Sequence, residues 1–224
     1  MHGRIIYVNP AVLNGVAPYD DFVKNAAPSI RPALAIATAY DNVVVARGWI
    51  YSVASPLVTP DVPMVFAGLA GRWQKAPEEM PFLYSFEYGQ LPRIEGANAQ
   101  ILNVANRTLQ TIGGLRFQKG RALFGAAIQL VESKSILVEC CEFENNSAGS
   151  GGGALLAFSS TSIEIVDCSF RKNTQSVIGF TNVPTVFGGG GAAIFYQAAG
   201  IARRNLHPIR DAAAHPFHGD ERGF

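Results

Sequence analysis

The chain has 224 residues, 48% of them hydrophobic and 16% charged, which is enough apolar material for a substantial core in one or two domains. Its formal net charge of +1 lacks the basic excess of proteins that bind nucleic acid or anionic membranes, so neither partner is expected. The start of the chain does not resemble a signal peptide, and no apolar run is long enough to predict a transmembrane segment.

The first 51 residues predict an N-terminal cap and a first coil. Residues 5–10, "IIYVNP", indicate a short strand, and "DNVVVARGWIYS" at 41–52 is strongly strand-forming. Between them, "PSIRPALAIATAY" at 28–40 predicts a helix with Ser29 as candidate N-cap, and we expect this helix to cap the core. Residues 52–92 carry six prolines and predict a strand at 64–69 followed by a long irregular excursion.

Residues 93–197 repeat two short phrases. Runs of three to six residues alternate with Gly or Asn, and the same residue types return at steps of 26 or 27 residues until an insertion at 175–188 lengthens the last step. The repeated positions are Phe117, Phe143 and Phe170; Cys141 and Cys168; Asn146 and Asn173; and Gly125, Gly152 and Gly191. We expect a repeat domain over 1–197 and a disordered or truncated tail over 198–224.

A repeat of short strands cannot bury its own apolar face, so its copies must stack into a solenoid. We therefore predict an all-β protein, a parallel β-helix in which equivalent residues form columns about 4.8 Å apart. The three phenylalanines would stack inward, beside a column of Ile112, Val138 and Ile165. Leu115, Cys141 and Cys168 would form a third column.

The polar and small repeat residues predict corners of the coil. Asn146 and Asn173 would adopt the left-handed conformation at a corner and link their side-chain amides from coil to coil, with Gly120 meeting the same conformational demand. The glycines of the second phrase would allow a tight corner, and the alanine two residues later, as in Ala127 and Ala154, would let two walls approach.

The phrases also carry a resemblance. "FENN" and "FRKN" have the form F-x-x-N, and "GGAL" has the form G-G-A-[I/L/V], which the "GAAI" copies relax. Over residues 109–197 the chain resembles the repeat of the chlamydial polymorphic outer-membrane proteins, within the pectin-lyase-like superfamily. The resemblance implies a right-handed, single-stranded parallel β-helix in a monomeric protein that lies outside the cell or on its surface.

The cysteines and histidines do not have the spacing of a metal site, and no metal is expected. His207, His215 and His218 lack acidic or cysteine partners at ligand spacing. If the coils stack Cys141 beside Cys168, the pair forms either a disulfide or two buried free thiols, and we favour the thiols. Asn106, in "NRT", fits the glycosylation acceptor pattern if the chain is secreted.

Outward positions supply the candidate site residues. Stacked opposite charges predict Arg116–Glu142 and Glu144–Arg171 pairs on a solvated face. The superfamily includes enzymes that cleave acidic polysaccharides, and resemblance to them implies carboxyl groups that act as acid and base. Glu139 and Asp167, however, do not share a column. The catalytic candidates are Glu139, Glu142, Glu164 and Asp167. The aromatic candidates for stacking on sugar rings are Trp49, Trp73, Tyr84 and Tyr88.

Three functions remain open on these residues. The first is a non-enzymatic secreted or surface-displayed β-helix, similar to an adhesin passenger, that binds a glycan or a protein along its lateral face. The second is a polysaccharide lyase or glycoside hydrolase, for which calcium is the one cofactor considered. The third is a fragment of a longer β-helix protein. The repeat residues themselves specify structure and carry no chemistry.

Overall fold

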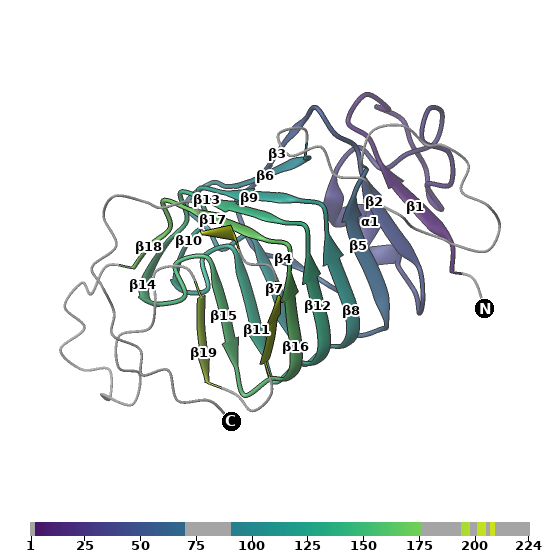
Figure 1. The fold of residues 1–224 in the computed structure, drawn as a ribbon. Helices are drawn as coiled ribbons and strands as arrows, with labels where there is room; N and C mark the ends of the chain where they lie inside the picture. The colour runs from purple at the N-terminus through teal and green to yellow at the C-terminus, as the bar shows by residue number, and fades with distance from the viewer. Residues whose placement is uncertain (1–2, 70–90, 176–193, 198–200, 205–206, 209–224) are drawn as a thin grey trace.

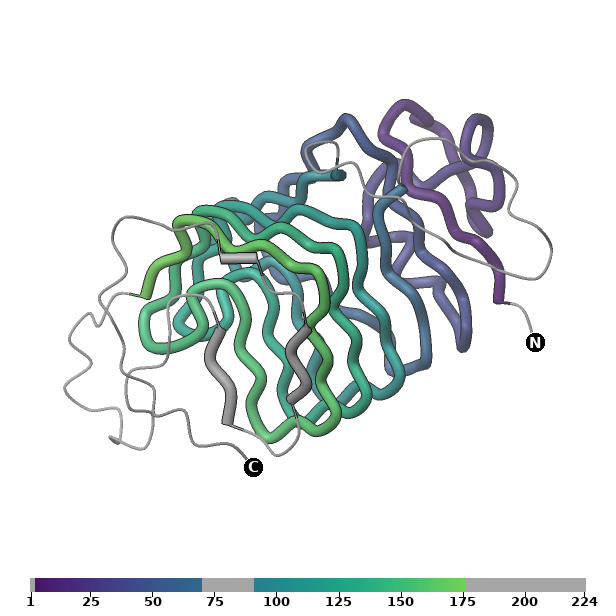
Figure 2. Tube along the Cα trace, in the orientation of Figure 1, coloured from purple at the N-terminus to yellow at the C-terminus, as the bar shows by residue number. Residues whose placement is uncertain are grey.

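The structure, a computed structural model, describes residues 3–69, 91–175, 194–197, 201–204 and 207–208. These residues form a β-solenoid of about four turns, in which every strand pairing between coils is parallel (Figure 1). Figure 2 shows the chain winding through successive loops of similar outline. The all-β parallel coil predicted from the repeat is confirmed.

Four sheets make up the walls of the described coil. The seven-stranded sheet runs β1 (Ile5–Val8), β2 (Asn42–Val45), β5 (Met64–Gly68), β8 (Thr108–Gly113), β12 (Lys134–Glu139), β16 (Thr161–Val166) and β20 (Ile201–Arg204). The six-stranded sheet runs β3 (Ile50–Val53), β6 (Arg93–Gly96), β9 (Arg116–Gln118), β13 (Glu142–Glu144), β17 (Ser169–Arg171) and β21 (His207–Pro208). The five-stranded sheet runs β4 (Leu57–Val58), β7 (Leu102–Ala105), β11 (Ile128–Val131), β15 (Leu155–Phe158) and β19 (Ile194–Gln197). The three-stranded sheet runs β10 (Arg121–Phe124), β14 (Ser147–Gly151) and β18 (Thr174–Gln175).

The predicted strand at 64–69 corresponds to β5, and β4 is a further strand within the interval expected to be irregular. Both strands pair with later coils, since Leu57 lies opposite Leu102 and Met64 lies opposite Gln110. The described part of that interval therefore belongs to the coil. Residues 70–90 of the excursion, most of the 175–188 insertion and the 209–224 stretch of the tail lie outside the described residues.

The inward columns match the predicted ones. The Phe117 and Phe143 rings are stacked with centroids 5.4 Å apart, and the Phe143 and Phe170 rings with centroids 4.7 Å apart. Because aromatic rings in contact also remove a large apolar area from water, this stack anchors the core. The aliphatic column and the column of the two cysteines are both buried throughout. The first consists of Ile112, Val138 and Ile165, and the second of Leu115, Cys141 and Cys168.

A change of step from 26 to 27 residues occurs at one corner. Phe117 lies opposite Phe143, a step of 26, whereas Ile128 lies opposite Leu155, a step of 27. Between these positions the register of β10 and β14 shifts, because Ala122 pairs with Ala148 but Phe124 pairs with Gly151. The extra residue of the later coil is therefore accommodated as a bulge in β14, and the core columns on either side stay in register.

The corners of the coil use left-handed residues, at positions that differ in part from the predicted ones. Gly125 and Gly152 have φ of +55° and +60°, as expected for a tight turn. The left-handed residue at the asparagine corner, however, is the one before the predicted position. The non-glycine members of the corner columns are Asn106, Glu132 and Ser159; Leu109, Ser135 and Ser162; Cys140 and Asp167; and Lys119, Asn145 and Lys172. The prediction of left-handed backbone at Asn146, Asn173 and Gly120 is wrong, since their exposed predecessors make the turn.

Asn146 instead points inward and hydrogen-bonds the corner. Its Oδ1 accepts from the Gly120 amide at 2.9 Å, and its Nδ2 donates to the Phe117 carbonyl at 3.0 Å and to Asn173 Oδ1 at 2.9 Å. The predicted amide ladder between coils is thus confirmed. Gly120 begins this column because a Cβ there would lie 2.3 Å from the Ala126 carbonyl oxygen. Close approach of backbone, and not a positive φ, requires the glycine.

A second polar ladder was not anticipated. Ser133 and Ser160 are buried at equivalent corner positions, and the Ser133 amide donates to Ser160 Oγ at 3.1 Å. Ser133 Oγ in turn donates to the Val104 carbonyl at 2.6 Å. Each hydroxyl therefore satisfies backbone groups that the turn removes from the sheet ladder.

The N-terminal end of the solenoid is covered mainly by a loop. The free edge of β1 is bonded by residues 19–27, since the Tyr7 amide donates to the Tyr19 carbonyl and the Ala27 amide to the Tyr7 carbonyl. The one helix among the described residues, α1 (Ile30–Ile36), contacts β1, β2 and β4 and buries Ile30, Ala33 and Leu34. It is shorter than the segment predicted to be helical, Ser29 makes no side-chain cap, and its capping role stays a prediction.

The asparagine ladder predicts a specific loss of stability. Replacing Asn146 with alanine leaves the Gly120 amide and the Phe117 carbonyl without their side-chain partners in a buried corner. We expect the free energy of unfolding to fall by roughly 3 kcal/mol in urea denaturation. Asn145→Lys is the matched control, because lysine already occupies the same left-handed position in both neighbouring coils, and it should stay within about 0.5 kcal/mol of wild type. Equal losses in both variants would contradict the role of the ladder.

Candidate functional site

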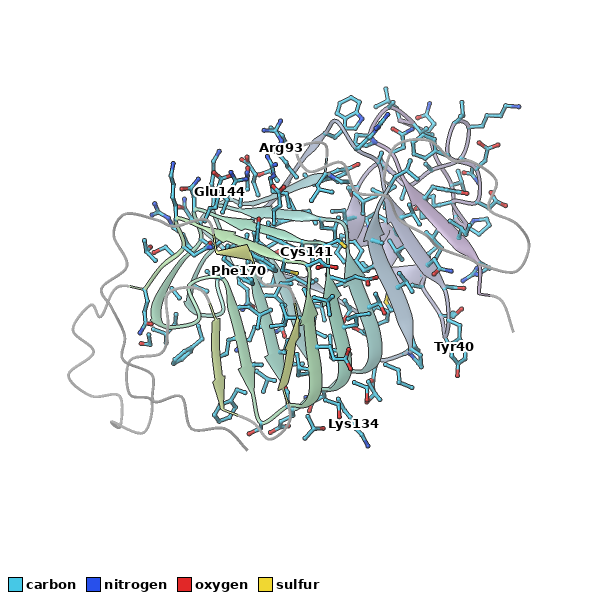
Figure 3. All side chains as sticks on the ribbon, viewed as in Figure 1. Tyr40, Arg93, Lys134, Cys141, Glu144 and Phe170 are labelled. Atoms are coloured by element: carbon cyan, nitrogen blue, oxygen red, sulfur yellow. The ribbon has the colours of Figure 1, made fainter. Side chains whose placement is uncertain are left out.

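Charged side chains gather on the outer surface of the six-stranded sheet. One outward column runs through Ile50, Arg93, Arg116, Glu142 and Ser169, and the second through Ser52, Glu95, Gln118, Glu144 and Arg171. The next corner adds Lys119, Arg121 and Lys172, and these columns with the corner are called the charged face below. In Figure 3, Arg93 and Glu144 point away from the core on this side, and Lys134 points away on the opposite side.

Glu142 is the centre of the charged face. Its carboxylate accepts a hydrogen bond from Arg116 in the preceding coil and forms an ion pair with the same residue. The carboxylate also lies 3.6 Å from the guanidinium of Arg171 in the following coil. Only 3% of the Glu142 side chain is exposed. The predicted Arg116–Glu142 pair is confirmed, but the pair is largely buried, so the expectation of a solvated face is wrong at this position.

The second column is also linked across coils. Gln118 Nε2 donates to Glu144 Oε2 at 2.8 Å, and Lys119 Nζ donates to Glu95 Oε2 at 3.0 Å. Arg171 contacts Glu142 rather than the predicted Glu144, because its guanidinium reaches diagonally to the other column. The face therefore carries three separate groups of side-chain contacts, and each contact joins residues of neighbouring coils.

The charged face carries more positive charge than the chain as a whole. It holds six of the 18 basic residues and three of the 17 acidic ones, a formal charge of +3 against +1 for the whole chain. The basic members are Arg93, Arg116, Lys119, Arg121, Arg171 and Lys172, and the acidic members are Glu95, Glu142 and Glu144. Arg93, Lys119 and Arg121 are exposed and present their charges to solvent.

Exposed apolar groups lie at the N-terminal end of this face. Ile50 begins the column that continues to Arg93, and Trp49 directly precedes it with 44% of its surface exposed. Of the four aromatic candidates, Trp49 is the one within the described residues, and its carbonyl accepts a hydrogen bond from the Arg93 amide at 3.3 Å. Trp73, Tyr84 and Tyr88 lie outside the described residues.

The four catalytic candidates do not meet in one site. Glu142 is ion-paired on the charged face, and Glu164 is exposed on the outer surface of β16. Glu139 and Asp167 lie at the corner between the seven-stranded and six-stranded sheets, on adjacent coils. Burial, and then the nearby Asp167 carboxylate, raise the pKa of Glu139 above its ordinary value. These two carboxyl groups are the one pair that the fold brings together.

Cys140, Cys141 and Cys168 are free thiols in this structure. Among the described residues, no group of three or more His, Cys, Asp or Glu side chains could hold a metal ion. Nor does any helix in that part of the chain have the length and apolar character needed to cross a membrane. Asn106 is exposed at a left-handed corner, where the glycosylation pattern can be reached from solvent.

Comparisons with known proteins gave no relative. No model of a known protein family matches the chain, and no curated protein or solved structure is significantly similar to it.

The burial of Glu142 predicts that its charge matters for stability. Glu142→Gln leaves two guanidinium groups without their shared carboxylate, and we expect the free energy of unfolding to fall by about 2 kcal/mol. Glu144→Gln is the control, since Glu144 is more exposed and accepts from an uncharged amide, and its effect should stay below about 1 kcal/mol. The comparison is read from urea unfolding at neutral pH and low salt. A smaller effect at Glu142 than at Glu144 would refute the assignment.

The raised pKa of Glu139 predicts that removing its charge stabilises the fold at neutral pH, whereas removing the charge of Glu142 destabilises it. A carboxyl group whose pKa is higher in the folded state binds its proton more tightly there, so its contribution to stability falls as the pH rises above the pKa of the unfolded chain. Glu139→Gln should therefore raise the melting temperature at pH 7, and the gain should shrink towards pH 4. Glu164→Gln, at an exposed position of the neighbouring coil, is the matched control, and it should not raise the melting temperature at pH 7.

Proposed function

We propose that this chain is a non-enzymatic scaffold that binds an acidic glycan along the charged face. In this proposal the coil is the right-handed parallel β-helix of the pectin-lyase-like superfamily, with repeats of the chlamydial polymorphic outer-membrane type, displayed outside the cell or on its surface as a monomer. The resemblance of the repeat residues supports the assignment. The observation that carries the binding proposal is the excess of basic residues on one face of a chain that is almost neutral overall.

The geometry of the face suits an extended polymer. Its basic residues lie on the coils of β6, β9 and β17, and successive coils are about 4.8 Å apart along the solenoid axis. Arg116 and Arg171 are held in place by Glu142, so binding would cost little side-chain entropy at these positions. Arginine also forms paired hydrogen bonds with carboxylate and sulfate-like groups. A glycan with regularly spaced acidic groups can engage several coils at once.

Trp49 extends the face with an apolar surface. Its exposed ring lies next to the start of the Arg93 column, where a sugar ring could stack on it. Aromatic stacking and cationic side chains at one end of the same face would favour one direction of the bound chain.

The proposal predicts binding on a glycan array that contains uronate-rich, sulfated and neutral polymers. Uronate or sulfated glycans should bind and neutral ones should not, and the binding should weaken as salt screens the charges. Arg93→Ala should reduce the affinity at least about tenfold, equivalent to 1.4 kcal/mol. The matched control is Lys134→Ala, which removes an exposed positive charge from the opposite side of the coil (Figure 3). Equal loss in both variants, or no glycan bound, would count against the proposal and favour a protein partner.

A polysaccharide lyase or glycoside hydrolase is the second candidate. Glu139 and Asp167 favour it, because burial and the nearby Asp167 carboxylate raise the pKa of Glu139, and a carboxyl group that holds its proton beside a second carboxyl group can serve as a general acid. We expect such an enzyme to release reducing ends or unsaturated uronates from pectin, alginate or chondroitin, with calcium considered only for the lyase. Turnover that Asp167→Asn abolishes, while the variant keeps its circular dichroism spectrum and melting temperature, would replace the scaffold proposal.

A further inference from the structure

Two inward thiols lie in consecutive coils at equivalent positions. Cys141 precedes β13 and Cys168 precedes β17, and the residues that follow them, Glu142 and Ser169, are ladder partners. The Ser169 amide donates to the Cys141 carbonyl at 2.9 Å. Equivalent residues of neighbouring parallel strands are about 4.8 Å apart, which lies within the 4.4–6.8 Å between Cα atoms that a disulfide spans.

The two side chains also have the same orientation. Each thiol lies close to the carbonyl two residues earlier in its own coil, at 3.2 Å for Cys141 and 3.3 Å for Cys168. Both residues are completely buried. Because the two Cα–Cβ bonds point into the core side by side, rotation of a thiol about its Cα–Cβ bond brings one sulfur towards the other.

We propose that Cys141 and Cys168 form a disulfide between neighbouring coils when the chain folds in an oxidising compartment. The bond would close a loop of one full coil, two residues before Phe143 and Phe170 of the phenylalanine stack. It is independent of what the charged face binds.

Oxidation leaves neither of the two carbonyl groups nearest the thiols without a partner. The two carbonyl groups nearest the thiols, those of Glu139 and Val166, already accept backbone hydrogen bonds from Gly114 at 3.1 Å and from Cys140 at 3.0 Å. The thiols therefore contribute only additional weak donors. A disulfide is also apolar, and it would lie in the same column as Leu115. The core can accept the bond without a buried unsatisfied group.

Cys140 is not a suitable partner for Cys141. It is the left-handed residue of its corner and is partly exposed, whereas Cys141 points into the core. The fold therefore selects Cys168 over the adjacent cysteine.

The reaction needs an oxidant and access to it. With oxidised glutathione, the thiolate of one cysteine attacks a glutathione sulfur and releases one glutathione thiolate, and the second cysteine thiolate then displaces the other glutathione. The two cysteines lose two electrons and two protons, and one glutathione disulfide becomes two glutathione thiols. Both cysteines are buried in the closed coil, and burial raises the pKa of Cys141 well above its ordinary value. The bond must therefore form before these coils close.

Order of addition tests this inference on the full chain. In the first arm, the reduced and unfolded protein is refolded in a buffer of oxidised and reduced glutathione; in the second arm, the buffer is added after refolding. Free thiols are then alkylated under denaturing conditions, and peptides are mapped by mass spectrometry. We expect a Cys141–Cys168 link with only Cys140 alkylated in the first arm, and three alkylated cysteines in the second. Three alkylated cysteines in both arms, or a link that includes Cys140, would overturn the proposal.

Cysteine substitutions and the melting temperatures of the oxidised and reduced protein provide a second test of the proposed disulfide. Cys140→Ser should still form the link, and Cys168→Ala should leave Cys141 free for alkylation in either arm. The oxidised wild-type protein should melt roughly 5–10 °C above the reduced protein, because the bond restricts the unfolded chain. This comparison needs no substitution, so a variant that fails to fold does not affect it. A lower melting temperature for the oxidised protein would also contradict the proposal.

Discussion

The backbone ladder between successive coils is the interaction on which the rest of this structure depends. The described coils hydrogen-bond in parallel to their neighbours, so that residues of paired strands lie beside their counterparts. Phenylalanine meets phenylalanine in the core, asparagine meets asparagine at a corner, and arginine meets glutamate on the outer surface. Because the ladder fixes these neighbours, the chemistry of one position is repeated along the axis of the molecule.

The corners make that ladder possible. A chain that turns several times per coil must place residues in the left-handed conformation, and here many of them are not glycine. The strain is offset by the residue that follows or by a nearby hydroxyl, as Asn146 and Ser133 show. The corner residue itself can then carry an exposed side chain, such as that of Lys119 on the charged face. The same device that turns the chain also supplies charge to its surface.

The sequence predicted which residues share a column, because the repeat step reports register directly. It therefore anticipated the phenylalanine stack, the aliphatic column and the cysteine pair. It did not reveal which of two adjacent asparagines would make the turn, because Asn145 and Asn146 are identical side chains. Nor did it reveal the burial of Glu142 or its contact with Arg171, because these depend on how long side chains pack diagonally across strands. The first coils were also less predictable, since the steps between β3 and β6 and between β5 and β8 are much longer than 27 residues.

The bulge in β14 has a consequence for how such a rod can vary. One additional residue enters at a single corner, and the aromatic stack before it and the aliphatic wall after it remain aligned. Length changes at this corner are thus decoupled from the interior. Related chains could gain or lose surface loops here while the hydrophobic interior stayed the same, so the exterior of the rod could diversify at little cost in folding.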